Sequence, residues 1–330
     1  MDKKLKAMMV CFLRPDIVML ICFCFAAPTV AAEPTGLVLR ADGEVFAEVL
    51  AGLSSDVEGE LRLVELKMSK NISFRDIKKE IKKVKPHIII LIGNSAMNVY
   101  TQYQNRNPNQ AFPPAVALAA LYVNKLVEKM SNTTGIRYEI PAVTSLVNMR
   151  ALLDQQVKKV GVVYRSWMQD VLDENTAYTK LEGINLVGHV LPNRDQNMVG
   201  KLRAAISKLL DEKVDAFWII NDNTLLNRET FVKAWLPLLG DSSTPVVVGV
   251  KSLVESNLNF GVYAIVPDHY ALGIQAASMV FDIMDANWSI DGIEIQQPIS
   301  VKKIVNMKVV SQKGIHIVPE KLTEVDNVIH

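Results

Sequence analysis

The sequence predicts an α/β protein with two Rossmann-like lobes, each built around a parallel sheet, joined by a hinge of several strands. Between Lys158 and Gly273, short apolar runs alternate with amphipathic helical or connecting segments. Near-continuous runs of Val and Ile of this length are typical of strands buried on both faces of a parallel sheet. A similar alternation starts at Thr35, so we expect two lobes of the same kind.

The first half of the chain alternates between strand-like runs and helical patterns. Ser73 followed by Asp76 predicts a capping box, in which two side chains close the start of a helix. The expected elements of this half are a strand at 35–40, a helix carrying Val45, Phe46, Val49 and Leu50, a strand at 61–67, a helix at 74–85, and strands at 87–93 and 114–121.

The second half contains five apolar runs that we interpret as strands. They are KVGVVY, ending at Tyr164, INLVGHV (184–190), VDAFWII (214–220), TPVVVGV (244–250) and FGVYAIV (260–266). Helices are expected at 198–211, 225–236 and 268–284. The first of these has a clear apolar stripe, formed by Leu202, Ala205, Ile206, Leu209 and Leu210.

Three segments are expected to pass between the lobes. They are Asn132–Pro141, the chain near Pro267, and the stretch near Ile293–Val301. We therefore assign residues 33–140 and 267–292 to lobe 1, and residues 141–266 and 293–330 to lobe 2. Two similar halves with several crossings predict hinge motion about a ligand held in the cleft between them.

The first 32 residues have the features of a secretory signal peptide. Basic residues precede an eleven-residue apolar run at 17–27, and small residues follow at Val30, Ala31 and Ala32. The run is too short to cross a bilayer, which needs about twenty apolar residues. Cleavage at Ala32 or retention of the leader are both compatible with the sequence. Export to a bacterial periplasm is the localisation we expect.

Composition excludes several classes of function. All three cysteines, Cys11, Cys22 and Cys24, lie in the leader, so the mature chain would have no thiol chemistry, disulfide or thiolate metal site. The formal net charge of +1 argues against nucleic-acid binding. No dinucleotide, phosphate-loop or hydrolase motif is present, and the five histidines lack metal-ligand spacing. We expect no cofactor, no metal and no enzymatic activity.

Residues that directly follow strands are the candidates for ligand binding, because parallel α/β sheets bind ligands at the carboxyl ends of their strands. Gly93, Asn94 and Ser95 end one strand and open a helix, whose free N–H groups can hold a carboxylate or phosphate. In the second lobe, Asp222 and Asn223 could accept hydrogen bonds from a ligand ammonium. Both groups could equally be ordinary helix caps, Asp222 or Asn223 capping the helix at 225–236.

Aromatic and basic side chains complete the candidate site. Tyr164 and Trp167 follow the first strand of the second lobe, where Trp167 could stack on a solute or pack under the next helix. Arg40 follows the first strand of the first lobe. Lys251 follows the run at 244–250, and if it faces the cleft it would favour an anionic group.

Six segments resemble, in the right order, those of the substrate-binding proteins of ABC transporters. They are IILIGNSAMNVY (89–100), SNTTGI (131–136), KKVGVVY (158–164), VDAFWIINDNTLL (214–226), FGVYAIVPDHYALGIQAA (260–277) and VNMKVVSQKGIHIVPEKL (305–322). The resemblance implies the type I periplasmic-binding-protein fold. Relatives take up tryptophan, tyrosine or other amino acids. Asp222 and Asn223 match a paired Asp-Asn of the family, while Trp167 departs from its usual Asn-Pro turn.

The resemblance implies a periplasmic protein that binds a small solute, for instance an amino acid, and delivers it to an ABC permease in the inner membrane. The alternative is a ligand-sensing protein that acts on a membrane receptor or kinase. We expect a monomer in either case. The ligand's identity stays open, because aromatic residues favour one class of solute and Lys251 and Arg165 another.

Overall fold

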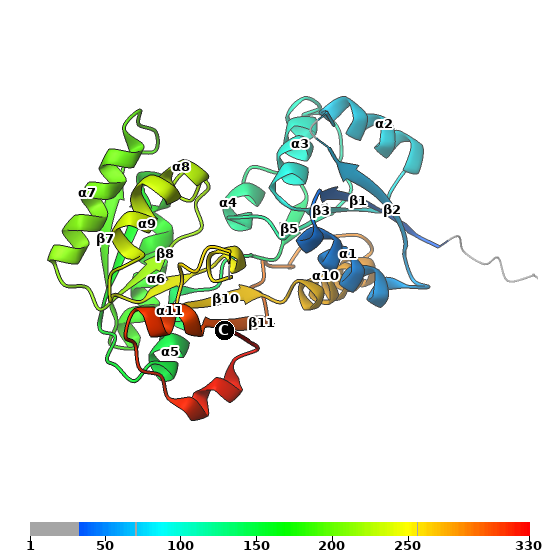
Figure 1. Ribbon diagram of the computed structural model, residues 1–330. Helices are drawn as coiled ribbons and strands as arrows, with labels where there is room; N and C mark the ends of the chain where they lie inside the picture. The colour runs from blue at the N-terminus through cyan, green and yellow to red at the C-terminus, as the bar shows by residue number, and fades with distance from the viewer. Residues whose placement is uncertain (1–32, 70, 256) are drawn as a thin grey trace, which may run out of the picture. The chain divides into compact units, whose positions relative to one another are not determined.

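The computed structural model describes residues 33–330 apart from residues 70 and 256, and these residues form two α/β lobes, each around its own sheet (Figure 1). The predicted leader lies outside the described residues. Each lobe has its own sheet, so the fold class predicted from the sequence is confirmed.

The first lobe contains a five-stranded sheet in which every pair of neighbours is parallel. Its strands, in the order β2-β1-β3-β4-β5, are β1 (Thr35–Ala41), β2 (Arg62–Met68), β3 (Ile88–Ile92), β4 (Ala115–Leu118) and β5 (Thr133–Gly135). Its helices are α1 (Glu44–Val57), α2 (Phe74–Val84), α3 (Asn94–Asn105), α4 (Val123–Val127) and α10 (His269–Asp285). The capping box of Ser73 and Asp76 is present at the start of α2, as predicted.

Helices cover both faces of this sheet. Apolar side chains of α2, α3 and α4 pack on one face, and those of α1 and α10 pack on the other. Both faces of β3 are therefore buried, which explains the unbroken Ile and Leu of the segment at 88–92.

Two glycines let α1 and α10 approach backbone to backbone (Figure 1). A Cβ atom on Gly52 would lie 2.0 Å from the carbonyl oxygen of Tyr270, and one on Gly273 would lie 2.1 Å from that of Val49. Since α10 follows β10 of the other lobe, this contact anchors a returning segment of chain firmly on the first lobe.

The second lobe contains a seven-stranded sheet in the order β12-β11-β10-β9-β8-β6-β7. Its strands are β6 (Lys159–Arg165), β7 (Asn185–Leu191), β8 (Ala216–Ile219), β9 (Val246–Val248), β10 (Tyr263–Pro267), β11 (Val301–Asn306) and β12 (Asn327–Ile329). Only the β10–β11 pair is antiparallel among the described pairs of this sheet.

Helical segments again lie on both faces. The α-helices are α5 (Ala142–Leu152), α6 (Gln169–Leu181), α7 (Met198–Asp211), α8 (Arg228–Thr230), α9 (Leu236–Leu239) and α11 (Met307–Gln312). Short 3₁₀ turns lie at Ser166–Met168, Lys251–Leu253 and Pro319–Glu324, and a π-helical turn lies at Phe231–Trp235. Side chains of α5, α6 and α11 pack on one face, and those of α7, the π-helical turn and α9 on the other.

The two sheets share one strand order. Strands β7-β6-β8-β9-β10 repeat the pattern β2-β1-β3-β4-β5, so β6 corresponds to β1 and β8 to β3. In each lobe the order reverses between these two strands, and sheets of this kind bind ligands at that switch point. Ligand sites in such sheets are usually formed by the residues that directly follow the strands at the switch point. In this protein these are the residues after β1, β3, β6 and β8.

Two predicted element boundaries are wrong. The expected helix at 225–236 begins instead at Arg228, because Asn227 and Thr230 form the capping box that starts it. Neither Asp222 nor Asn223 caps that helix. The expected strand at 114–121 ends at Leu118, since Ala119 and Tyr122 have positive φ angles, which extended backbone does not allow.

The chain passes between the sheets in three places. The first crossing runs from Ile136 to Pro141, the second joins β10 to α10 near Asp268, and the third leads into β11 at Val301. A bridge between Ile136 and Gln296 holds the first and third crossings side by side.

Candidate functional site

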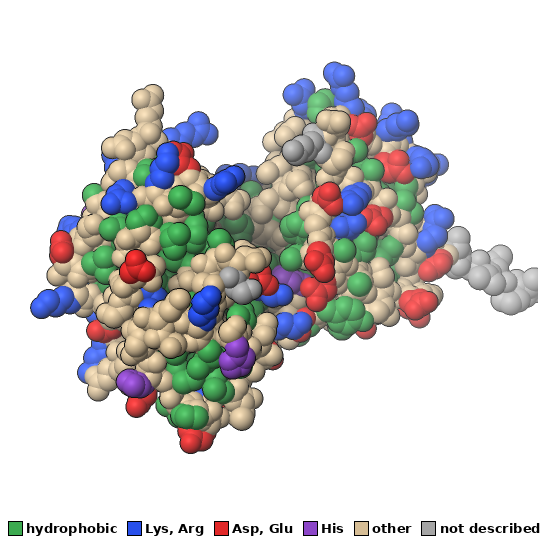
Figure 2. Space-filling view, in the orientation of Figure 1, with side chains coloured by type: hydrophobic (Ala, Val, Ile, Leu, Met, Phe, Trp, Pro, Cys, Tyr) green, Lys and Arg blue, Asp and Glu red, His purple; other side chains and the backbone are tan. Residues whose placement is uncertain are grey.

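A cleft of about 1360 Å³ lies between the two lobes, and Figure 2 shows it as a hollow in the surface. The first lobe lines it with Glu44, Val45, Glu48 and neighbouring residues of α1. The second lobe lines it with the segments that follow β8 and β9, and Tyr138 and His269 lie on crossings between the lobes. The cleft therefore lies at the carboxyl ends of β8 and β9, as expected for this sheet topology.

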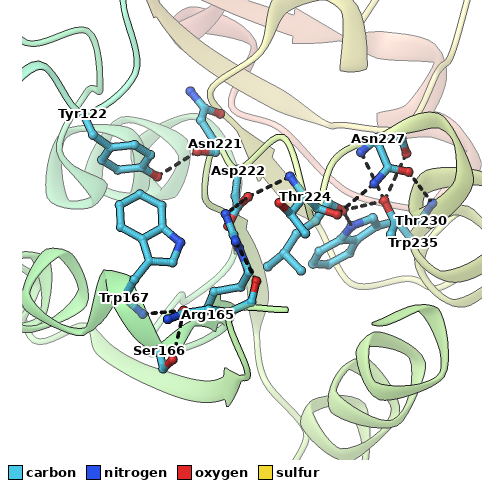
Figure 3. Close-up of polar contacts among 12 residues, drawn as sticks. Tyr122, Arg165, Ser166, Trp167, Asn221, Asp222, Thr224, Asn227, Thr230 and Trp235 are labelled. Carbon is cyan, nitrogen blue, oxygen red and sulfur yellow. Dashed lines mark hydrogen bonds and ion pairs between the residues drawn. The ribbon is translucent and has the colours of Figure 1, made fainter. Parts of the chain in front are cut away.

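Arg165, at the end of β6, and Asp222, after β8, form a two-pronged ion pair across the switch point of the second lobe (Figure 3). The guanidinium Nε donates to Oδ2 at 2.6 Å, and Nη2 donates to Oδ1 at 2.8 Å. Oδ1 also accepts the backbone N–H of Thr224. The side chain of Asp222 is 1% exposed, so this carboxylate already has its charge partner inside the protein.

Asn221 lies beside that pair and faces the cleft. Its side-chain Nδ2 donates to the carbonyl of Gly249 at 3.2 Å, whereas its buried Oδ1 has no hydrogen-bond partner among the described residues. A Cβ atom on Gly249 would lie 2.8–2.9 Å from the atoms of this amide, so Gly249 leaves the room that Asn221 fills. The unpaired oxygen is available as an acceptor.

Tyr122 of the first lobe reaches the second lobe at the same point (Figure 3). Its hydroxyl donates to the backbone carbonyl of Asn221 at 2.7 Å. Burial, with help from nearby carboxylates, raises the pKa of Tyr122, so this hydroxyl stays protonated and can donate. The bond ties the turn after β4 to the end of β8.

Trp167 packs on Tyr122 edge to face, with ring centroids 4.9 Å apart. Lys125 of α4 lies over the indole ring and donates to the carbonyl of Trp167 and, at 2.5 Å, to Asp170. The indole Nε1 is buried and has no acceptor among the described residues. The structure thus places Trp167 in an interlobe contact and not among the residues that line the cleft.

The predicted ligand-binding residues of the first lobe, Arg40, Asn94 and Ser95, lie away from the cleft, and two of them are bonded inside their own lobe. The guanidinium of Arg40 pairs with Glu65 at 2.7–2.8 Å. The side-chain amide of Asn94 both donates to and accepts from the backbone of Leu121, so it holds the turn after β4. Ser95 is exposed at the start of α3. None of the three is among the residues that line the cleft.

Among the other predicted site residues, Asn223 and Lys251 line the cleft beside Asp222. The ammonium of Lys251 lies 3.4 Å from Glu255, and both side chains are partly exposed. Tyr164 is buried in β6, where its hydroxyl donates to Gln169. The wall of the second lobe also presents exposed apolar side chains, namely Val232, Leu236 and Leu258.

Sequence reasoning did not single out the side chains on the crossings. His269 stacks on Tyr138, and their Nε2 and hydroxyl oxygen lie 2.9 Å apart. Burial lowers the pKa of His269, while Glu48, 3.4 Å away, opposes that effect. A segment that joins two lobes must border the cleft between them, and this rule could have pointed to both residues.

A smaller cavity of about 40 Å³ adjoins the cleft, with which it shares Tyr138, Asn221 and Gly249. Glu139, on the first crossing, lies in its wall. Its Oε1 accepts the backbone N–H of Tyr122 at 2.7 Å, and its buried Oε2 has no partner among the described residues. Burial raises the pKa of Glu139 from 4.5 to about 6, against the opposing effects of the backbone N–H groups of Tyr122, Glu139 and Tyr138 and of the Arg137 charge.

Within the described residues, no group of three or more His, Cys, Asp or Glu side chains could hold a metal ion. The same part of the chain contains no helix long and apolar enough to cross a membrane.

Two lobes of one topology, three crossings and a cleft at the strand ends define a two-lobed binding protein. The family model described as "ABC transporter substrate binding protein" matches residues 64–329. The chain belongs to this family of solute-binding proteins. A comparison with curated protein sequences finds no match.

Several solved structures share this fold. A domain from Streptococcus pneumonia in complex with L-Trp is 17% identical with a TM-score of 0.59, and a conserved domain protein from Vibrio cholerae is 18% identical with the same score. A ligand-free, open substrate binding protein with adhesive properties from Clostridium difficile is 13% identical with a TM-score of 0.68. Each match covers 90% of this chain and 99% of the other. At these identities the likeness concerns the fold.

Proposed function

We propose that this chain is the exported solute-binding component of an ABC importer, that it takes a small solute into the cleft, and that it passes the solute to a membrane permease without chemical change. The observation that carries this proposal is the cleft itself. Its walls come from both lobes, so a solute of the right size can touch both at once. Family membership supports the same role.

The cleft favours an amphipathic solute. Val232, Leu236 and Leu258 offer apolar surface on one wall, while the acidic residues of α1 and the free amide oxygen of Asn221 offer polar contacts. An amino acid with a bulky side chain fits this combination. The complex of the Streptococcus pneumonia neighbour with L-Trp agrees with this class of solute.

Lobe closure is the proposed mechanism. Residues 33–140 with 267–292 would move as one body, and residues 141–266 with 293–330 as the other, about the three crossings. A solute that contacts both lobes binds the closed arrangement better and shifts the population toward it. Closure also removes water, which strengthens the hydrogen bonds to the solute.

Native mass spectrometry of the protein purified from the periplasm tests the proposal. We expect one small molecule per chain, released unchanged on unfolding and rebound by the refolded protein in calorimetry. Absence of any bound molecule, together with no thermal shift on adding the twenty amino acids, would contradict solute binding. Chemical conversion of the bound molecule would contradict a role in transport alone.

A further inference from the structure

Helix α2 concentrates positive charge on the surface of the first lobe. Residues 74–85, which are α2 and its C-cap residue, carry six basic and two acidic side chains, whereas the whole chain has 36 basic and 35 acidic residues. The six basic residues, called here the basic face of α2, are Arg75, Lys78, Lys79, Lys82, Lys83 and Lys85. All of them except Lys78 are exposed. Figure 2 shows Lys and Arg side chains gathered over α2, at the outer edge of this lobe.

Helical spacing places these charges side by side. Arg75, Lys79 and Lys82 recur at intervals of four and three residues, which is the spacing of one helix face. Ile77 and Ile81 lie on the opposite face and are buried in the core of the first lobe. The apolar side of α2 is therefore used inside the protein, and the basic face points outward.

Most of these charges have no counter-charge on the protein. Within the described residues, Lys83 is the one member of the basic face with an ion pair, at 2.8 Å from Glu80. The carboxylate of Asp76 is held in the capping box at the start of the helix. Lys78 donates to the side-chain oxygen of Asn107, which is a neutral group. Five positive charges are thus left unneutralised on one short helix.

Surface lysines of the second lobe are arranged differently. Several of them lie between 2.5 and 3.9 Å from a carboxylate, namely Lys159, Lys201, Lys233, Lys251 and Lys321. In the first lobe, by contrast, the basic face continues onto a neighbouring helix. The guanidinium of Arg106, at the end of α3, lies 4.4 Å from the ring centroid of Phe74 and is exposed. The excess charge is therefore local to α2 and the end of α3.

The residue types indicate what such a surface would attract. Five of the six members of the basic face are lysines. An arginine suits fixed, two-pronged contacts with the carboxylates of a folded partner, whereas a lysine is a mobile point charge on a flexible stem. The headgroups of an anionic bilayer form a diffuse layer of negative charge, for which mobile charges are sufficient. Each Lys or Arg near such a surface strengthens binding about fivefold.

We propose that the basic face of α2, extended by Arg106, docks this protein on an anionic phospholipid membrane by electrostatic attraction. The helix does not insert, because Ile77 and Ile81 are already buried in the lobe. This role goes beyond the proposed solute binding, since no residue of α2 is among those that line the cleft. Docking of this kind keeps the binding protein close to the bilayer that contains a permease.

Co-sedimentation with lipid vesicles tests the proposal. The probes are vesicles of phosphatidylcholine alone and vesicles of phosphatidylcholine mixed with phosphatidylglycerol. We expect the protein to bind the mixed vesicles only, and the bound fraction to fall steeply as sodium chloride is raised, because salt screens exposed charges. Equal binding to both kinds of vesicle, no binding to either, or binding that salt does not weaken would overturn the proposal.

Two variants that lose the same charge locate the surface. The first replaces exposed residues of the basic face by glutamine, at Arg75, Lys79 and Lys82. The control replaces exposed residues of the second lobe by glutamine, at Lys180, Lys208 and Lys308. We expect the first variant to bind mixed vesicles at least about tenfold more weakly than wild type, and the control to stay within about twofold. Equal weakening by both would attribute the binding to net charge and contradict a docking surface on α2.

An acidic protein is the other partner that a basic helix could attract, and soluble polyglutamate is the probe for it. We expect polyglutamate, at a carboxylate concentration equal to that of the anionic lipid, to leave most of the protein on the mixed vesicles. Complete displacement would show that the basic face binds acidic peptide at least as well as a bilayer, and the membrane assignment would be wrong.

Discussion

Arg165 and Asp222 are 57 residues apart in the sequence and form a two-pronged ion pair between the ends of β6 and β8. The carboxylate is almost fully buried, and the guanidinium is 15% exposed. The pair occupies the switch point of the second lobe, the place from which ligands are usually held. Asp222 lines the cleft, so the ion pair holds its carboxylate in a fixed position there with its charge already neutralised.

Removing one partner of this pair should destabilise the protein. Asp222→Asn leaves the Arg165 guanidinium without its counter-charge, so we expect the free energy of unfolding to fall by about 3 kcal/mol, as found for broken buried pairs. Urea unfolding followed by circular dichroism gives this value. Glu229→Gln, which breaks the exposed pair with Lys233, is the control and should cost less than about 0.5 kcal/mol. A similar small cost for Asp222→Asn would show that the pair contributes little.

The stability of the ligand-free protein should depend on pH through Glu139. Its pKa is raised to about 6 in the folded protein, so the folded state binds this proton more tightly than the unfolded state. The cost of the buried charge is absent below pH 4.5 and fully present above pH 6. A shift from 4.5 to about 6 corresponds to about 2 kcal/mol.

Glu139→Gln removes this titration, which makes the effect measurable as a difference between two proteins. The variant should gain about 2 kcal/mol over wild type above pH 6 and little near pH 4.5. The other charged groups near Glu139 are Arg137 and its partner Glu174, and both are common to the two proteins. A difference that does not change between pH 4.5 and 7 would contradict a raised pKa.

Lys313 links the C-terminal part of the chain to α9. Its buried ammonium donates to the backbone carbonyls of Leu239, Gly240 and Ser242, at 2.6, 3.2 and 2.6 Å. Lys313→Met leaves these carbonyls unpaired, and we expect a loss of about 2 kcal/mol in the free energy of unfolding. Lys308→Met, on the exposed side of α11, should change it by less than about 0.5 kcal/mol. Equal effects of the two variants would rule out a specific role for Lys313.

The close approach of α1 and α10 should not tolerate a side chain. In Gly273→Ala the new methyl would lie 2.1 Å from the Val49 carbonyl oxygen and 2.6 Å from the Leu53 nitrogen, both of which are backbone atoms. We expect a loss of at least about 2 kcal/mol, since the helices must move apart. Thermal unfolding compared with Ser278→Ala, an exposed change on α10, measures it. Equal melting temperatures for both variants would mean that the contact is loose.

The sequence predicts most of the fold because its patterns are local. Val and Ile runs identify buried strands, the stripe with Leu202 and Ile206 identifies α7, and Ser73 with Asp76 identifies the start of α2. The helix after β8 was misplaced because two capping choices compete there. Asn227 and Thr230 form a complete box, whereas the Asp222 carboxylate is held by a distant arginine.

The candidate site is less accessible to sequence reasoning, because it depends on which partners a polar side chain finds in three dimensions. Arg40 and Asn94 follow strands as expected. The side chain of Arg40, however, is paired with Glu65, and that of Asn94 is hydrogen-bonded to the backbone of Leu121. Glu139 looked like part of a connecting segment. Only the packing of that segment against Tyr122 leaves one of its oxygens buried and unpaired.

Hydrogen exchange with the co-purified solute tests the central claim most directly, namely that the solute lies between the lobes and touches both. We predict slower exchange at 44–51 of α1 and at 221–228 after β8, in both segments together. Protection confined to one lobe, or located away from these segments, would contradict the account.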